Sequence, residues 1–253
     1  MTGAGPGTRG GRGAAEVPAP TPAVPPVDAV VIGAMAEEVR PYTDRATEVG
    51  PAIQLGAAEA RLLDVGGTRL LLVRSGIGLV NAASAAVAAL MMVHPRALVS
   101  TGSAGGLAAV VEVGDVVVGE RHTYAGADAT AFGYERGQVP GMPPAYAADR
   151  ALLDAARAVV PAAGVLRTGE MVSGDSFVTA ANVSEVREAF PAALSTDMES
   201  TALAQVCHSH GVPFLSVRGI SDLCGPSAYQ DFHMAVDEVA DRAADVVLAV
   251  LSA

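Results

Sequence analysis

The chain has 253 residues, of which 51% are hydrophobic, and its formal net charge is −11. This length and apolar content allow a substantial core in one or two domains. A negative field of this strength repels phosphate backbones, and because no basic cluster offsets it, nucleic acid is not expected as a partner.

Residues 1–26 differ in composition from the rest of the chain. They include six Gly and six Pro and too few apolar side chains to offset the entropy lost on ordering. We therefore expect a disordered Gly/Pro-rich tail over residues 1–26 and one folded domain over residues 27–253.

No pattern in the sequence indicates export or membrane insertion. The N-terminus lacks a charged-then-apolar signal. The longest apolar stretch, 79–93, is interrupted by Asn81 and Ser84 and is short for a membrane span. Cys207 and Cys224 lack CxxC spacing, which favours reduced thiols over the alternative of a structural disulfide. We expect a cytoplasmic protein that makes no membrane contact.

From residue 27 onwards, apolar β-branched runs alternate with helical patterns. Strands are predicted, in chain order, at 27–33, 68–78, 96–107, 114–124, 164–177 and 212–222. Helices are predicted at 37–46, 79–93, 148–159, 182–190, 199–210 and 233–253. The alternation indicates one α/β layer fold with a largely parallel sheet.

Polar residues follow three of the predicted strands. Glu37 and Glu38 come after the first strand, residues 103–106 follow a middle strand as a glycine turn, and Ser221 with Asp222 follow FLSVRGI in the last. In open α/β sheets, ligands bind outside the carboxyl ends of the strands. The three segments therefore predict a single binding site at one edge of the sheet.

Each segment also has a simpler structural explanation. The glycine-rich TGSAGGL (101–107) could present backbone N–H groups to an anion, a sugar or a base edge, or could be only a tight turn between a strand and a helix. Glu37 and Glu38 could complement a helix dipole, and Asp222 could cap a following turn. For these acids, considered one at a time, the structural explanation is favoured.

The stretch LSTDMESTALAQV (194–206) has the pattern of a helix start. Thr196 supplies an N-cap hydroxyl and Glu199 follows three residues later, ahead of an apolar run, as in a capping box. Downstream, Cys207, His208 and His210 would point in different directions from a helix, so no metal site is expected there.

Six motifs occur in the order, and at about the spacings, that are typical of one known family. They resemble those of the 5′-methylthioadenosine/S-adenosylhomocysteine (MTA/SAH) nucleosidases, members of the nucleoside phosphorylase superfamily, and the resemblance covers nearly all of residues 28–253. The motifs are VVIGAMAEEV, TGSAGGL, DATAFGYERGQVPG, VSGDSF, TDMESTALAQVC and VPFLSVRGISD.

The resemblance implies a fold and an activity. The implied fold is a single-domain, three-layer α/β/α sandwich with a mixed, mostly parallel twisted sheet, assembled as a homodimer. The implied activity is hydrolysis of the bond between adenine and the thioribose, in methionine salvage and the recycling of S-adenosylmethionine by-products, with 5′-deoxyadenosine as a further candidate substrate. No metal or organic cofactor is implied.

The resemblance also implies roles for residues at matching positions. Glu38 resembles the base that activates water, Asp222 the acid that protonates the leaving adenine, and Glu199 the carboxylate that binds the ribose hydroxyls. Met198 would lie under the ribose, and Phe232 would stack on the base or line the thioalkyl end. Val178 with Phe177 resembles the pair that holds adenine, and Gly105, beside Ser103 and Ala104, would lie along the sugar and base. Further substrate contacts are implied for Met35, Arg218 and Ser221, and Phe132 and Pro140 would reach the 5′ pocket of the neighbouring subunit.

The chain departs from the usual sequence of the family at two positions. Asp197 stands where the family usually has Glu, and Ala36 where it often has a third Glu.

Two other functions remain as alternatives. A phosphorylase of the same superfamily would need cationic side chains to bind phosphate, for which Arg40, Arg74 and Arg218 are candidates. The negative charge of the implied base would, however, repel phosphate. A non-catalytic nucleoside-binding protein would have no need for an acid and a base.

Overall fold

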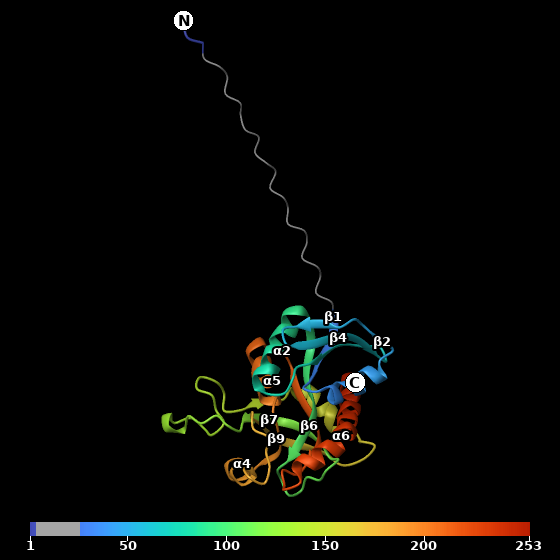
Figure 1. Ribbon diagram of the computed structural model, residues 1–253, viewed down its shortest axis with the longest axis vertical. Helices are drawn as coiled ribbons and strands as arrows, with labels where there is room; N and C mark the ends of the chain where they lie inside the picture. Colours follow the sequence, from blue (N-terminus) through green and yellow to red (C-terminus); the bar gives the residue numbers. More distant parts are fainter. Residues whose placement is uncertain (4–25) are drawn as a thin grey trace.

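The computed structural model describes residues 1–3 and 26–253 of the chain (Figure 1). The tail predicted over residues 1–26 therefore lies almost entirely outside the described residues. The first strand begins at Pro26, one residue before the predicted start of the folded domain.

Strands and helices alternate along much of the described chain, with four consecutive strands between the first two helices. The strands are β1 (Pro26–Gly33), β2 (Glu48–Val49), β3 (Ile53–Leu55), β4 (Ala58–Val65), β5 (Thr68–Arg74), β6 (His94–Gly106), β7 (Val116–Tyr124), β8 (Tyr146–Ala147), β9 (Leu166–Ser173), β10 (Ala193–Asp197) and β11 (Phe214–Asp222). The helices are α1 (Ala36–Arg45), α2 (Leu79–Met92), α3 (Arg150–Arg157), α4 (Val183–Ala189), α5 (Ser200–His210) and α6 (Ala228–Leu251), with one 3-10 turn, η1 (Thr130–Phe132).

One mixed sheet runs through the fold in the order β10-β9-β7-β11-β6-β1-β5-β4-β2. Its central strands β5, β1, β6 and β11 are parallel, whereas β4 and β7 join them in antiparallel orientation. The last residues of the 13-residue strand β6, Gly105 and Gly106, also pair with β10, so β6, β11, β7, β9 and β10 close into a ring. The predicted α/β class and mixed sheet are confirmed, and the ring is an additional feature.

Helices cover both faces of this sheet. Helices α2 and α5 pack together on one face, while α1, α3 and α6 lie on the other (Figure 1). Fully buried Val, Ile and Leu side chains of the central strands form the two cores between these layers, and each contributes about 1.5–3 kcal/mol on burial. The small side chains that let α2 approach the sheet closely are Ala82, Ala85, Ala86 and Ala89.

The six predicted helices are all present, and only the start of the last one is displaced by more than two residues. Helix α6 begins at Ala228, five residues before the predicted start at position 233. Pro226 and Ser227 end the turn that leaves β11, and the helix starts directly after them.

The capping box predicted at Thr196 is wrong. Strand β10 continues through Thr196 to Asp197, because the backbone of Thr196 pairs with Val172 of β9 and Gly105 of β6. The N-cap of α5 is Glu199. The carboxylate of Asp197 supplies the missing acceptor, since its Oδ1 receives the N–H groups of Glu199 at 3.0 Å and Ser200 at 2.9 Å.

Candidate active site

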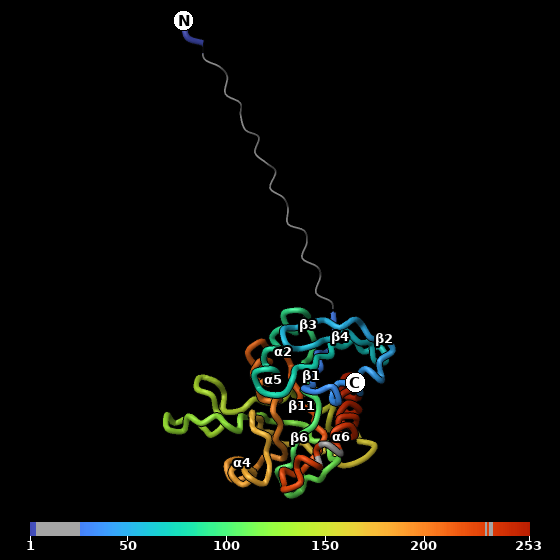
Figure 2. The backbone as a smooth tube through the Cα atoms, in the orientation of Figure 1, coloured from blue at the N-terminus to red at the C-terminus, as the bar shows by residue number. Residues whose placement is uncertain are grey.

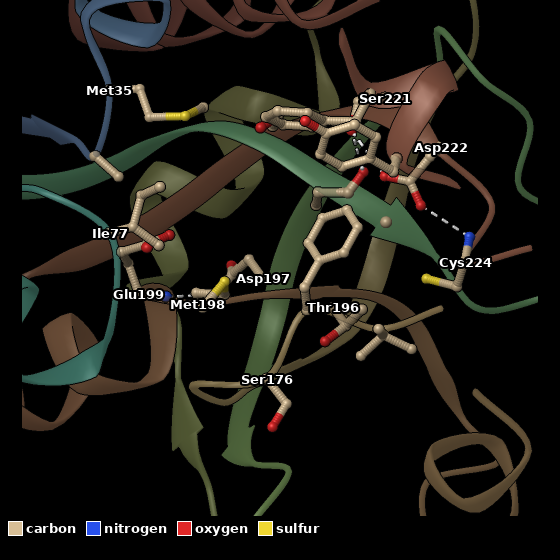
Figure 3. Close-up of a pocket in the computed structure, with 18 of the residues that line it drawn as sticks. Met35, Ile77, Ser176, Thr196, Asp197, Met198, Glu199, Ser221, Asp222 and Cys224 are labelled. Carbon is tan, nitrogen blue, oxygen red and sulfur yellow. Dashed lines mark hydrogen bonds between the residues drawn. The ribbon is translucent and has the colours of Figure 1, made fainter. Parts of the chain in front are cut away.

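A cavity of about 510 Å³ opens at the carboxyl ends of β1, β6 and β11 (Figure 3). These strands are parallel neighbours, so the residues that end or follow them meet at one edge of the sheet, as the sequence predicts. The described residues that line the cavity are Ala34, Met35, Glu38, Ile77, Ser103, Ala104, Gly105, Ser176, Phe177, Val178, Thr196, Asp197, Met198, Glu199, Ser221, Asp222, Cys224, Tyr229 and Phe232.

Glu38 lies in the first turn of α1 and is only 2% exposed. Its Oε2 accepts the N–H groups of Ala34 at 2.8 Å and Met35 at 3.1 Å. Its Oε1 accepts the N–H of Ser103 at 2.8 Å and the hydroxyl of Ser103 at 3.0 Å. These four donors fix the carboxylate in one orientation at the cavity wall, which is the requirement for a positioned base.

Gly102 makes room for the Glu38 carboxylate. A Cβ at position 102 would lie 2.3 Å from Glu38 Oε1, and the backbone φ of +139° also favours glycine. The segment is the end of strand β6 and not a turn between a strand and a helix, so that structural explanation for TGSAGGL is wrong. The backbone N–H of Ser103 does bind an anion, but the anion is the protein's own Glu38.

Asp222 ends strand β11 and is 2% exposed. Its Oδ1 accepts the N–H of Cys224 at 2.8 Å, and its Oδ2 accepts the hydroxyl of Ser221 at 3.1 Å. Cys224 adopts a φ of 56°, the left-handed conformation that reverses the chain and brings its N–H back to the carboxyl group. Figure 3 draws Asp222 and Cys224 on the side of the cavity opposite Glu199.

Glu199 and Arg218 form the charged centre of the site. The Arg218 guanidinium is 1% exposed, and its nitrogens lie 3.5 Å from Glu199 Oε2, 3.4 Å from Asp197 Oδ2 and 3.9 Å from Glu38 Oε1. Burial raises the pKa of Glu199 to about 7, and although Arg218 opposes this shift, the Asp197 and Glu38 carboxylates add to it. Glu199 Oε1 also accepts the N–H of Gly78 at 2.9 Å.

Asp197 differs from Glu199 in its electrostatic surroundings. Burial alone would raise the pKa of Asp197, but the charge of Arg218 and hydrogen bonds from Ser173 and Ser200 outweigh burial and hold it below its usual range. Asp197 therefore stays ionised beside Arg218 and organises the start of α5.

Comparison with known proteins gives the family. The model of the phosphorylase superfamily matches residues 28–252. The MTA/SAH nucleosidase of Colwellia psychrerythraea 34H, solved in complex with adenine, is 32% identical with a TM-score of 0.85 over 88% of this chain and 94% of that chain. The MTA/SAH nucleosidase of Neisseria meningitidis, solved in complex with methylthio-immucillin-A, is 36% identical and has a TM-score of 0.83. The match covers 88% of this chain and 97% of that chain. The S. pneumoniae enzyme, with a transition-state inhibitor, is 30% identical with a TM-score of 0.82 over 89% and 98%.

The chain belongs to the MTA/SAH nucleosidases. All but three of the site residues implied by the sequence line the cavity of this nucleosidase. Among them, the rings of Phe177 and Phe232 meet edge to face, with centroids 6.0 Å apart. The cavity therefore combines an aromatic pair with the buried carboxylates.

The three exceptions are Arg218, Phe132 and Pro140. Arg218 was expected to contact substrate, but it is fully occupied with carboxylates and serine oxygens and is not among the lining residues. Phe132 is 83% exposed on the segment 125–145, which projects from the body of the nucleosidase (Figures 1 and 2). Phe132 and Pro140 do not line the cavity.

Several lining residues were missed by the sequence analysis. Ile77 lies between Gly76 and Gly78, three residues after the end of β5, so the strand-end argument used for the other segments would have found it. Ser176 precedes Phe177 in a motif that was recognised. Cys224 and Tyr229 carry no such signal, because the turn after β11 and the earlier start of α6 bring them to the cavity.

Other sequence predictions concern metals, thiols and membranes. Within the described residues, no three His, Cys, Asp or Glu side chains are arranged to hold a metal ion. Cys207 and Cys224 are both free and buried, which rules out the disulfide alternative. None of the helices in the described ranges combines the length and the apolar character that crossing a membrane requires.

Proposed function

We propose that this nucleosidase hydrolyses the N-glycosidic bond of MTA and SAH and releases adenine and the corresponding thioribose. The observation that carries the proposal is one cavity containing three buried carboxyl groups in different surroundings, those of Glu38, Asp222 and Glu199. The binding of adenine and of methylthio-immucillin-A by relatives that are 32% and 36% identical supports the same substrate class.

Asp222 is the proposed acid. As the bond between the sugar C1′ and the purine nitrogen breaks, electron density builds on the purine, and a proton from Asp222 neutralises it as adenine leaves. The N–H of Cys224 and the hydroxyl of Ser221 hold the carboxyl group in a single orientation for this transfer.

Glu38 is the proposed base. It takes one proton from a water molecule while the water oxygen bonds to C1′, so the sugar gains a hydroxyl group. One proton therefore leaves Asp222 with adenine and one arrives at Glu38, which balances the reaction. The hydrogen bonds from Ala34, Met35 and Ser103 keep the Glu38 carboxylate aimed at one point.

Glu199 is proposed to grip the ribose hydroxyls, with Met198 under the sugar. A carboxylate that accepts two O–H groups holds the substrate in its reacting geometry. Phe232 is proposed to stack on the base or to line the thioalkyl end. Further substrate contacts are proposed for Met35, Ser103, Ala104, Gly105, Phe177, Val178 and Ser221.

Hydrolysis is favoured over phosphorolysis by the charges around the cavity. None of the described residues that line it is Lys or Arg, whereas phosphate binding needs cationic side chains. The three candidate cations have acidic partners: Arg40 pairs with Asp237, Arg74 with Glu59, and Arg218 with three carboxylates.

Adenine release from MTA in phosphate-free buffer tests the reaction. We expect release that added phosphate does not accelerate, and release that appears only with phosphate would show phosphorolysis. Competition between MTA, SAH, 5′-deoxyadenosine and 6-amino-6-deoxyfutalosine would rank the 5′ substituents.

Substitution of the acid and the base separates an enzyme from a nucleoside-binding protein. Glu38→Gln and Asp222→Asn should each lower kcat by roughly 100-fold or more, the usual contribution of a positioned acid or base, while nucleoside binding persists. An unmutated protein that binds nucleosides without turnover would instead be a binding protein.

We also propose that the nucleosidase works as a homodimer, with residues 27–253 as the catalytic domain. Apolar side chains on the outer side of α2 are exposed: Val80 by 74%, Val87 by 39% and Met91 by 76%. In a dimer through this face, Phe132 and Pro140 on the projecting segment 125–145 would reach the 5′ pocket of the neighbouring subunit.

A further inference from the structure

One wall of the cavity is built by the loop that follows β9. Its residues Ser176, Phe177 and Val178 line the cavity, although only Val178 is buried. At its start, the N–H of Gly174 donates to the carbonyl of Asp197 at 3.1 Å. At its far end, the side-chain amide of Asn182 donates to the carbonyl of Phe177 at 3.4 Å, and the exposed residues between these two contacts have a further anchor through Asp175.

That anchor is the start of helix α2. The N–H of Leu79 donates to Asp175 Oδ1 at 2.8 Å, and the preceding N–H, that of Gly78, donates to Glu199 Oε1 at 2.9 Å. Consecutive backbone groups of one helix N-terminus therefore hold two carboxylates from different segments, Asp175 of the loop after β9 and Glu199 at the start of α5. Ile77, which precedes Gly78, also lines the cavity, and Figure 3 draws it beside Glu199.

The backbone at this junction is shaped for the contact. Gly78 has a φ of +106°, and a Cβ there would lie 3.0 Å from Asp175 Oδ1. The side-chain amide of Asn81 donates to the carbonyl of Ile77 at 2.8 Å, which holds the preceding residue against the first turn of α2. The first turn is thus a rigid base for both carboxylates.

We propose that Asp175 is a positioning residue that fixes the loop 174–178 relative to Glu199. The loop carries Phe177 and Val178, and Glu199 is the ribose-binding carboxylate, so this role of Asp175 rests on the proposed function. An acidic side chain that accepts an orphan N–H at a helix N-terminus is a stable cap. Through this cap, Asp175 sets the spacing between the wall beside the purine and the carboxylate that binds the sugar.

Asp175→Ala should raise KM for MTA about five- to tenfold and leave kcat within about twofold. The acid and the base keep their own anchors, Cys224 and Ser103, so the chemical step should persist in the bound substrate. Asp175→Asn should restore KM, because the amide oxygen still accepts the N–H of Leu79.

Asp149→Ala is the matched control. Asp149 caps α3 by accepting the N–H groups of Ala151 and Leu152, and it is not among the residues that line the cavity. Its removal should lower stability and leave KM unchanged. An equal rise of KM in Asp149→Ala and Asp175→Ala would overturn the proposal, because the effect would then reflect general destabilisation.

Adenine binding, measured by titration calorimetry, keeps this test separate from the proposed function. Asp175→Ala should weaken adenine binding at least threefold, and Asp175→Asn should bind as the unmutated protein does. If the unmutated protein binds adenine but hydrolyses no MTA, the proposed function fails and these constants still decide the role of Asp175. The role proposed for Asp175 would be overturned if Asp175→Ala left both adenine binding and KM unchanged. It would also be overturned if Asp175→Asn failed to restore adenine binding and KM.

Discussion

At the scale of single residues, Gly102 links the sheet to the proposed base. Its missing side chain leaves the space that Glu38 Oε1 occupies, and an added Cβ would also lie 2.9 Å from Arg218 Nη1. Gly102→Ala should therefore displace the carboxylate and lower kcat about 100-fold, which corresponds to about 2.7 kcal/mol at the transition state. Steady-state adenine release measures the loss.

A control separates this effect from backbone strain. Gly56 also has a positive φ, of +63°, but a Cβ there would have no neighbour within 4 Å. Gly56→Ala should cost some stability and keep full activity. Full activity in Gly102→Ala would show that Glu38 does not need its observed position.

Glu199 makes the stability of the protein depend on pH. Burial raises its pKa from 4.5 to about 7 in the folded chain. Between these values the folded protein keeps a proton that the unfolded chain releases, so the unfolding free energy falls as pH rises. The amide side chain of Glu199→Gln does not titrate. The unfolding free energy of this variant, relative to that of the unmutated protein, should therefore rise by on the order of 2 kcal/mol as pH rises from 4.5 to about 7.

Urea unfolding of both proteins at pH 4.5 and pH 8 measures this difference. The stabilising effect of Glu199→Gln should be larger at the higher pH. If the unfolding free energies of the two proteins differed by the same amount at both pH values, burial would not hold Glu199 in its neutral form.

At the scale of elements, ion pairs join α1, which carries Glu38, to α6. Arg45 on α1 lies 2.8 Å from both Asp241 and Asp245 on α6. Arg45→Ala should lower the unfolding free energy by about 1 kcal/mol, the upper end for exposed ion pairs, because two pairs between helices are lost together. Denaturant unfolding at low salt gives the value.

Arg150→Ala provides the comparison for Arg45→Ala. Arg150 is 95% exposed at its side chain and forms one 3.7 Å pair with Asp154 within α3. Its removal should change stability by less than about 0.5 kcal/mol. An equal loss of unfolding free energy in the two variants would show that the ion pairs between α1 and α6 stabilise the protein no more than one exposed pair within α3 does.

The sequence predicts elements well where the local pattern decides them, and less well where distant pairing does. The strands with long apolar runs and the Ala-rich helix α2 follow from periodicity alone. Strand β10 does not, because Thr196 has the pattern of an N-cap and only its pairing with Gly105 and Val172 makes it a strand residue. Strand β4 was not predicted, although the sequence contains a signal for it. Gly66 and Gly67, both with positive φ, form the hairpin turn from β4 to β5.

The whole cavity is predictable only in part for the same reason. Glu38, Gly105 and Asp222 end or follow strands, so topology brings them together once a parallel sheet is predicted. The position of Arg218 behind the carboxylates depends on which face of β11 it occupies inside the closed ring. No local pattern gives that face, since β11 is buried along its full length.

At the scale of the whole molecule, the proposed dimer gives a test that combines assembly with activity. Met91 is 76% exposed on the outer side of α2, and a charge there would be buried without a partner in a dimer formed through this face. Met91→Glu should therefore be a monomer at micromolar concentration, as measured by light scattering. Its kcat/KM for MTA should fall at least tenfold, because Phe132 and Pro140 of a neighbouring subunit would no longer complete the 5′ pocket.

Val160→Glu tests whether the effect is specific to α2. Val160 is 90% exposed but lies just after α3, so a charge there should leave both assembly and turnover unchanged. If Met91→Glu remained a dimer, α2 would not be the interface. If it became a monomer with full activity, the 5′ pocket would be complete within one subunit, and the substrate contacts proposed for Phe132 and Pro140 would be wrong.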